Sequence, residues 1–185
     1  MKDSEEKALI KALLDPSSKE EAFRELVRTY QERLYWHIRK IVLNHEDADD
    51  VLQNTFIKVF RNLESFKGNS SLFTWMYRIA TNESITHINK VKRKNKITDA
   101  EYNELALENL ESDVYFEGDA IQLQLQKAIA TLPDRQRMVF NMRYFDEMPY
   151  KEMSEILGVT VGGLKSTYHI ASQKIRVFLK DNETF

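Results

Sequence analysis

The sequence contains no cysteine, only five glycines and three prolines, and no long apolar run. The absence of cysteine excludes a disulfide framework and any zinc site that uses thiolates. No segment reaches the roughly 20 apolar residues of a membrane span, and residues 1–20 have no hydrophobic core of a signal peptide. Few glycines and prolines, with no alternating strand-like pattern, predict an all-α protein, and the cytoplasm is the expected compartment.

The net charge of −2 conceals a division along the 185 residues. Residues 1–96 carry 18 Lys and Arg against 14 acids, residues 97–119 carry eight acids and no Lys or Arg, and residues 120–185 carry nine bases against seven acids. This pattern predicts two small helical domains, 1–96 and 120–185, joined by the acidic linker 97–119. The linker is either a tether that lies in a basic channel of a partner or a plain spacer, and composition does not separate the two.

Residues 66–94 combine a loop, 66–71, with a long amphipathic helix. Ser70 or Ser71 is the expected N-cap, because a hydroxyl can accept a free amide of the first turn. The apolar positions recur at three- and four-residue steps and are Leu72, Trp75, Met76, Ile79, Ile85, Ile88 and Val91. The polar positions between and after them are Arg78, Thr81, Asn82, Asn89, Lys90, Lys92, Arg93, Lys94 and Lys96. Such a helix can lie along nucleic acid, since cations neutralise phosphate and amides bond base edges. The alternative is an ordinary core helix with a basic end.

The sequence pattern predicts a helix over residues 47–63 with acidic residues in its first turn, and a turn over residues 44–47 before it. Asp47 and Asp49 suit the positive end of the helix dipole. The inward positions are Val51, Leu52, Phe56, Val59, Phe60 and Leu63, and the outward positions are Asp50, Gln53, Asn54 and Lys58. A calcium-binding EF-hand would need Gly at the sixth position and Glu at the twelfth, and this window has neither. We therefore expect no metal site here, but an acidic surface that faces a partner.

Residues 150–179 have the pattern of a helix-turn-helix. Gly158 can take the left-handed backbone that closes helix 150–157, residues 159–161 form the turn, and a second helix starts near Gly162. That helix would enter a major groove. It would present Lys165, Ser166, His169, Ser172 and Gln173. An ordinary pair of packed helices is the alternative.

The two stretches together resemble bacterial RNA polymerase sigma factors, specifically the small extracytoplasmic-function (ECF) class. The segment DADDVLQNTFIKVFRNLESFKGNSSLFTWMYRIATNES resembles region 2 of the family, and LPDRQRMVFNMRYFDEMPYKEMSEILGVTVGGLKS resembles region 4. The resemblance covers about residues 20–95 and 120–180, and its parts stand in the family's order. It departs from the family at Thr167, Ile170 and Ser172, where Arg is frequent, so attraction to phosphate should be weaker.

The resemblance implies a protein that is not an enzyme, binds core RNA polymerase and directs it to promoters. Asp50, Gln53 and Asn54 match the family's contact with the clamp helices of the largest catalytic subunit. The positions that match the −10 reader, which captures a flipped base, are Phe66, Lys67, Asn69, Ser70, Arg78, Asn82, Lys90, Lys92 and Arg93. The positions that match the −35 reader are Lys165, Ser166, His169, Ser172 and Gln173. The linker would thread toward the polymerase active-site channel, and an anti-sigma factor is a common partner of this class. No cofactor, metal, small-molecule substrate or membrane insertion is expected.

Two other functions fit parts of the sequence. One is a helix-turn-helix regulator that acts without being a polymerase subunit, with an N-terminal half for dimerisation or sensing. The other is an enzyme acting on nucleic acid, which is disfavoured because the four histidines form no nucleophile–base set or metal triad in the sequence. These are His37, His45, His87 and His169.

Overall fold

The computed structural model describes residues 3–111 and 120–182, and within these ranges it contains helices and no strand. The all-α prediction is therefore confirmed for the described chain. The elements are α1 (Asp3–Leu14), α2 (Lys19–Val42), α3 (His45–Asn62), the 3₁₀ turn η1 (Leu63–Ser65), α4 (Leu72–Asn95), α5 (Asp99–Glu111), α6 (Ala120–Ala130), α7 (Asp134–Tyr144), α8 (Tyr150–Leu157) and α9 (Val161–Asp181).

Local chemistry sets the breaks between the first helices. The Asp15 carboxylate accepts from the amide and the hydroxyl of Ser17, at 2.9 and 2.8 Å, and so stabilises the turn after α1. Leu43 ends α2 in the left-handed conformation with φ 59°. The Asn44 side chain accepts from the Asp47 amide at 3.0 Å and caps α3. The predicted turn over 44–47 is therefore wrong in length, because an Asn cap lets α3 begin at His45.

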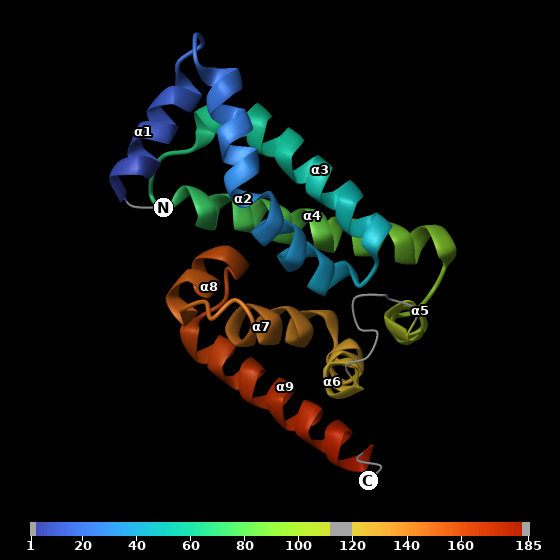
Figure 1. Cartoon of the computed structure of the whole chain (residues 1–185). Coiled ribbons are helices and arrows are strands. Elements are labelled where there is room, and N and C mark those ends of the chain that lie inside the picture. The colour runs from blue at the N-terminus through green and yellow to red at the C-terminus, as the bar shows by residue number, and fades with distance from the viewer. Residues whose placement is uncertain (1–2, 112–119, 183–185) are drawn as a thin grey trace.

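Helices α1 to α4 form the first bundle, in the upper part of Figure 1. Fully buried apolar side chains from α2 and α4, such as Leu26, Leu34, Ile38 and Met76, fill its centre. Removing such side chains from water is the main force that holds the bundle together. Helices α6 to α9 form the second bundle, which has its own buried cluster of Ala128, Ile129, Leu132, Phe140, Ala171 and Ile175.

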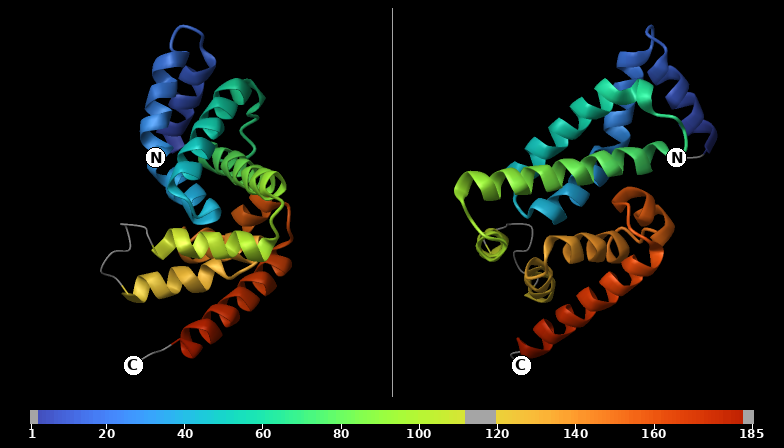
Figure 2. Two further views of the ribbon diagram at one scale, coloured as in Figure 1. Left: turned by 90° about the vertical axis from the view of Figure 1, so that its right-hand side faces the viewer. Right: turned by 180° about the vertical axis from the view of Figure 1, so that it is seen from behind.

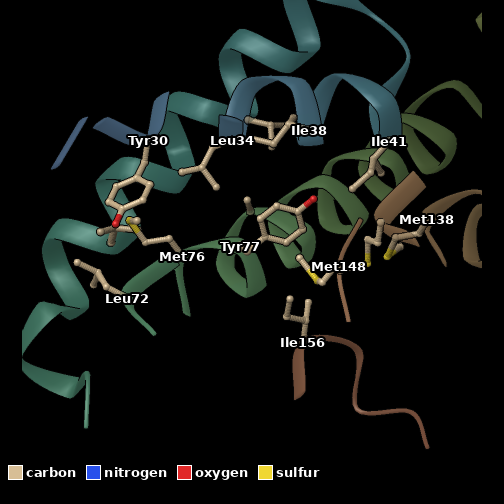
Figure 3. Packing of buried hydrophobic residues seen from close by; sticks show 14 of the residues in the cluster. Tyr30, Leu34, Ile38, Ile41, Leu72, Met76, Tyr77, Met138, Met148 and Ile156 are labelled. Atoms are coloured by element: carbon tan, nitrogen blue, oxygen red, sulfur yellow. The ribbon is translucent and has the colours of Figure 1, made fainter. Parts of the chain in front are cut away.

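The two bundles lie against each other. The second bundle lies below the first in every view of Figures 1 and 2, where α7 contacts α2, α8 contacts α4, and α5 contacts α6. Met148 and Ile156 belong to the same buried cluster as Leu34 and Ile38. Figure 3 shows the Tyr77 ring between these α2 residues and Met148. The apolar face of the second bundle is therefore buried by the first.

The sequence pattern assigns two side chains to the wrong side of their helices, one predicted to be buried and one predicted to be exposed. Phe60, predicted inward, keeps 37% of its surface exposed and lies edge-on against Phe23, with 4.9 Å between the ring centroids. Thr81, predicted on the polar flank of α4, is only 1% exposed. Its hydroxyl donates to the Tyr77 carbonyl at 2.8 Å, so a buried threonine satisfies its polar group within its own helix.

Candidate nucleic-acid interface

The outward face of α3 carries the residues that the sequence assigns to a protein partner. Asp50, Gln53 and Asn54 are all exposed, while Val51 and Val59 of the same helix are buried. Positions three and four apart lie on one face of a helix. The three polar side chains therefore form one continuous surface, and their predicted outward orientation is confirmed.

The loop 66–71 has the geometry of a fixed turn that leads into α4. Gly68 has φ +69°, a conformation that favours glycine because it has no Cβ. The Ser71 hydroxyl accepts from the Thr74 amide at 3.1 Å, which selects Ser71 of the two predicted caps. Phe66 lies 5.3 Å from Trp75, centroid to centroid, and Trp75, predicted as core, is partly buried. Lys67 and Asn69 remain exposed, while Ser70 is half-buried.

One face of α4 presents amides and cations to the surface. Arg78, Asn82, Asn89 and Arg93 are exposed and fall within about 60° of one another at roughly 100° per residue. Lys90 is also exposed, next to this row. The result is a polar strip along the helix that is long enough to follow a nucleic-acid strand.

Lys92 differs from the other predicted −10 residues. Its side chain is 11% exposed, and its Nζ lies 2.7 Å from an oxygen of Asp134 at the start of α7. The same ammonium lies 4.9 Å from the centre of the Tyr102 ring of α5. In this arrangement Lys92 therefore joins α4 to the second bundle and does not face solvent as a free cation.

The helix-turn-helix forms as the sequence predicts. Gly158 has φ +64°, and its amide bonds the Ser154 carbonyl to close α8. The Thr160 hydroxyl accepts from the Gly163 amide at 3.2 Å and caps α9. α9 begins at Val161, one residue before the predicted start.

A row of basic and polar side chains runs along α9. The row consists of Lys165, His169, Ser172, Arg176 and Lys180. All five side chains line one groove, together with apolar side chains of α6 and α7. Sequence reasoning missed Arg176 and Lys180, although the steps of four, three, four and four residues place them on the same face. Two further predicted residues, Ser166 and Gln173, are exposed beside this row. The Ser172 hydroxyl donates to the Tyr168 carbonyl at 2.8 Å and is half-buried, so it is less available to DNA than the cations.

A polar cluster joins the two bundles at Asp146, in the turn after α7. One carboxylate oxygen lies 2.8 Å from Nζ of Lys40, and the other accepts from the Tyr77 hydroxyl. His37 Nδ1 lies 3.7 Å away, too far for a hydrogen bond, while its Nε2 lies 2.8 Å from the Thr81 hydroxyl. The cluster therefore links α2 and α4 to the second bundle.

The ionisation of this cluster follows from its burial. Burial by itself would raise the pKa of Asp146, but interactions with His37 and Lys40 outweigh burial and lower the pKa to about 2. Burial lowers the pKa of His37, so the imidazole is neutral at pH 7. Burial and the nearby Asp146 raise the pKa of Tyr77, which keeps its hydroxyl as a proton donor. At neutral pH the cluster is thus an Asp146–Lys40 ion pair with a tyrosine hydrogen bond.

Helix α5 also connects the bundles. The Tyr102 hydroxyl donates to the Val42 carbonyl at 2.9 Å, and Arg137 of α7 donates to the Asn103 side chain at 3.1 Å. The sequence predicted short helical pieces in the segment 97–119, and α5 confirms this over Asp99–Glu111. The apolar residues Val114, Tyr115 and Phe116 of that segment lie outside the described residues.

Neither a metal centre nor a membrane-spanning helix is found among the described residues. Within residues 3–111 and 120–182, no three His, Asp or Glu side chains are grouped as a metal site would need. No described helix is long and apolar enough to cross a membrane.

Comparison with family models places two known regions on this chain. The sigma-70 region 2 model matches residues 26–94, which span most of α2, all of α3 and nearly all of α4. The model for sigma-70 region 4 matches residues 122–175, from α6 into α9. The matched segments contain all of the predicted contact residues.

Curated relatives cover most of the chain. The ECF RNA polymerase sigma factor SigW of Bacillus subtilis is 33% identical over 171 residues, covering 88% of this chain and 91% of that protein. The RNA polymerase sigma-H factor of Pseudomonas aeruginosa is 32% identical over 162 residues, covering 83% of this chain and 84% of that protein.

Solved structures share the fold. The sigma factor RpoE of Bartonella quintana, crystallised with the anti-sigma factor NepR, has a TM-score of 0.67 at 20% identity and covers 87% of this chain and 98% of its own. CnrH, solved with the cytosolic domain of CnrY, has a TM-score of 0.69 at 19% identity and covers 96% of this chain and 99% of its own.

Proposed function

This chain belongs to the ECF class of RNA polymerase sigma factors, and from that premise we propose how its surfaces divide the work of a promoter-specificity subunit. Residues 1–96 bind core RNA polymerase and the −10 element, residues 97–119 link the two parts, and residues 120–185 bind the −35 element. The observation that supports this division is that three polar faces are exposed on three separate helices: α3, α4 and α9.

The α3 face is the contact with core RNA polymerase. Asp50, Gln53 and Asn54 combine one carboxylate with two amides, which suits a partner helix rich in Arg or Lys. The surface bears no Lys or Arg between Asp50 and Lys58, so it would repel DNA phosphates rather than attract them. Polymerase binding and DNA binding are thus separated onto different helices.

The loop 66–71 and the exposed strip of α4 read the −10 element. Flipping a base out of the duplex costs a few kcal/mol, and stacking on aromatic side chains returns about 1–3 kcal/mol per base. Phe66 is the aromatic side chain at the edge of the loop, and Asn82 presents an amide that can bond a base edge. Because gain and cost are similar, melting also needs the polymerase to hold the DNA.

The row of side chains on α9 reads the −35 element as a duplex. Lys165 and His169 near the start of the helix are placed to reach base edges, while Arg176 and Lys180 continue along the same face. Each phosphate that a cation neutralises releases condensed counterions and adds sequence-independent affinity. We assign readout to the first part of α9 and backbone attraction to the second.

In the arrangement described above, which we call closed, the second bundle packs against α2 and α4. This arrangement must open before the −10 and −35 elements are both bound. By their names the elements lie about 25 base pairs apart, or about 85 Å at ~3.4 Å per base pair. In this structure α8, the helix before α9, touches α4 directly. The two readers therefore reach a promoter together only after α7 and α8 have left α2 and α4.

The partners follow from this mechanism. Core RNA polymerase and promoter DNA are required. An anti-sigma factor is proposed because one structural neighbour was solved with the anti-sigma factor NepR and the other with the cytosolic domain of CnrY. We propose a cytoplasmic location, because polymerase and chromosome are there. No chemical step is assigned to any residue of this chain.

Run-off transcription tests the function. Purified full-length chain, bacterial core RNA polymerase and a genomic fragment library should yield discrete transcripts that core polymerase alone does not make. Absence of initiation on every template would refute the proposal. Sequence-specific duplex binding by the chain alone, with no effect of core polymerase, would instead identify a helix-turn-helix regulator.

A further inference from the structure

Helix α1 lies outside the segment that matches the region 2 family model, yet one of its side chains reaches the start of the −10 reader. An oxygen of the Glu6 carboxylate accepts from the Leu72 amide at 2.7 Å. Leu72 is the first residue of α4, so its amide is one of the donors that the helix itself cannot satisfy. Ser71 satisfies the Thr74 amide, and Glu6 supplies the second cap from 66 residues earlier in the chain.

The carboxylate is held in place by its surroundings. Leu9 and Leu13, three and seven residues later, are buried in the main cluster and fix the face of α1 that carries Glu6. Tyr30 is close enough that the charge of Glu6 contributes, after burial, to raising the pKa of its hydroxyl, while Arg33 opposes this rise. The Tyr30 ring in turn stacks on Phe73, 5.7 Å between centroids. Glu6 therefore sits among α1, α2 and the first turn of α4.

The same helix also holds the other end of the loop 66–71. η1, which directly precedes Phe66, contacts α1, and its residue Leu63 belongs to the cluster that contains Leu9 and Leu13. Helix α1 thus touches the chain just before the loop and just after it. The loop spans the gap between two points that a single helix fixes.

We propose that Glu6 is a positioning residue for −10 melting, which holds the loop 66–71 in the shape that captures the flipped base. This inference rests on the role of the loop under the proposed function. A negative charge at a helix N-terminus is favourable, so the carboxylate both bonds the Leu72 amide and stabilises the first turn of α4. Without it, this turn frays and the loop loses one of its two anchors.

The experiment uses full-length chain with core RNA polymerase on a promoter fragment recovered by run-off transcription. Glu6→Ala, Glu6→Gln and the control Glu20→Gln, an exposed acid of α2, are compared with wild type. Four quantities are measured: thermal stability of the chain, affinity for core polymerase, permanganate reactivity at −10, and holoenzyme affinity for a single-stranded oligonucleotide of the −10 non-template strand.

Glu6→Ala should lower capture of the single strand and −10 reactivity about tenfold, or about 1.4 kcal/mol, while affinity for core polymerase stays unchanged. Glu6→Gln keeps an oxygen that can accept from the Leu72 amide and should recover part of the loss. Glu20→Gln should match wild type.

Two results would overturn the inference. One is single-strand capture by Glu6→Ala equal to that of wild type. The other is a parallel loss of core affinity, of thermal stability and of capture in both Glu6 variants, which would show a purely structural role. A wild-type protein that forms no open complex would refute the proposed function itself, and this outcome is separate from the other two.

Discussion

The Asp146 cluster gives the most direct prediction about how the closed arrangement is held. We expect Asp146→Asn to shift the protein from closed to open molecules. Asparagine keeps an oxygen that can accept from the Tyr77 hydroxyl, but it loses the charge that pairs with Lys40. The variant therefore removes the ion pair and retains the volume of the side chain.

The magnitude follows from the ionisation of the carboxyl group. The pKa of Asp146 falls from 3.8 to about 2 in the closed form through interactions with His37 and Lys40, which sets an upper bound of about 2 kcal/mol at ~1.4 kcal/mol per pKa unit. A pKa that is lowered on closing stabilises the closed form above about pH 4, and this contribution is lost as the pH falls toward 2. At pH 7 His37 is neutral and only the pairing with Lys40 remains, so the ratio of open to closed molecules should rise several-fold, with about 30-fold as the upper bound.

Energy transfer between two dyes measures this ratio. The chain has no cysteine, so thiols introduced at Arg61 of α3 and Lys174 of α9, both exposed, are the only labelling sites. Single-molecule histograms at pH 7 should show more low-transfer molecules for Asp146→Asn. Glu147→Gln removes the same charge from the neighbouring, exposed residue and should leave the histogram unchanged. Equal histograms for the two variants would refute the assignment of Asp146 as a contact that holds the bundles together.

Three further predictions address the proposed contact surfaces. Asp50→Ala with Gln53→Ala should abolish co-purification with core polymerase, since both side chains lie on the exposed face of α3; undiminished pull-down would contradict this role. Asn82→Ala should reduce permanganate reactivity at −10 several-fold with core binding intact, and unchanged reactivity would argue against a base contact. Arg176→Ala with Lys180→Ala should weaken −35 duplex binding equally for all sequences and flatten its salt dependence by about two phosphate contacts; an unaltered salt slope would exclude them from the interface.

Local features of the fold were predictable because their causes are local. Gly158 ends a helix, Ser71 caps one, and Asp50, Gln53 and Asn54 lie outward because spacing decides the face of an amphipathic helix. Phe60 shows the limit of this rule. It has the spacing of an inward residue, but it keeps 37% of its surface exposed, and within the described residues the aromatic and cationic partners of its ring are only Phe23 and the ammonium of Lys19.

The contacts between distant segments were not predictable from the sequence. In the sequence pattern, Thr81 falls on the polar flank of α4 and Tyr77 has no special feature. Both belong to a buried polar cluster only because the fold brings His37 and Asp146 against them. Glu6 likewise reads as one acid among several near the N-terminus. Arg176 and Lys180 are different, because their spacing from Lys165 was visible and the basic row could have been extended from it.

The Lys92 ammonium has two candidate partners, the Asp134 carboxylate and a DNA phosphate, and can pair with only one of them at a time. While it holds Asp134 it cannot hold a phosphate, and once it holds a phosphate α7 has lost an anchor. DNA that arrives at this end of α4 would thus exchange one anion for another, with little net change in charge pairing. At this position, binding of the promoter strand and release of the second bundle would become a single event, because the phosphate replaces Asp134 as the partner of Lys92.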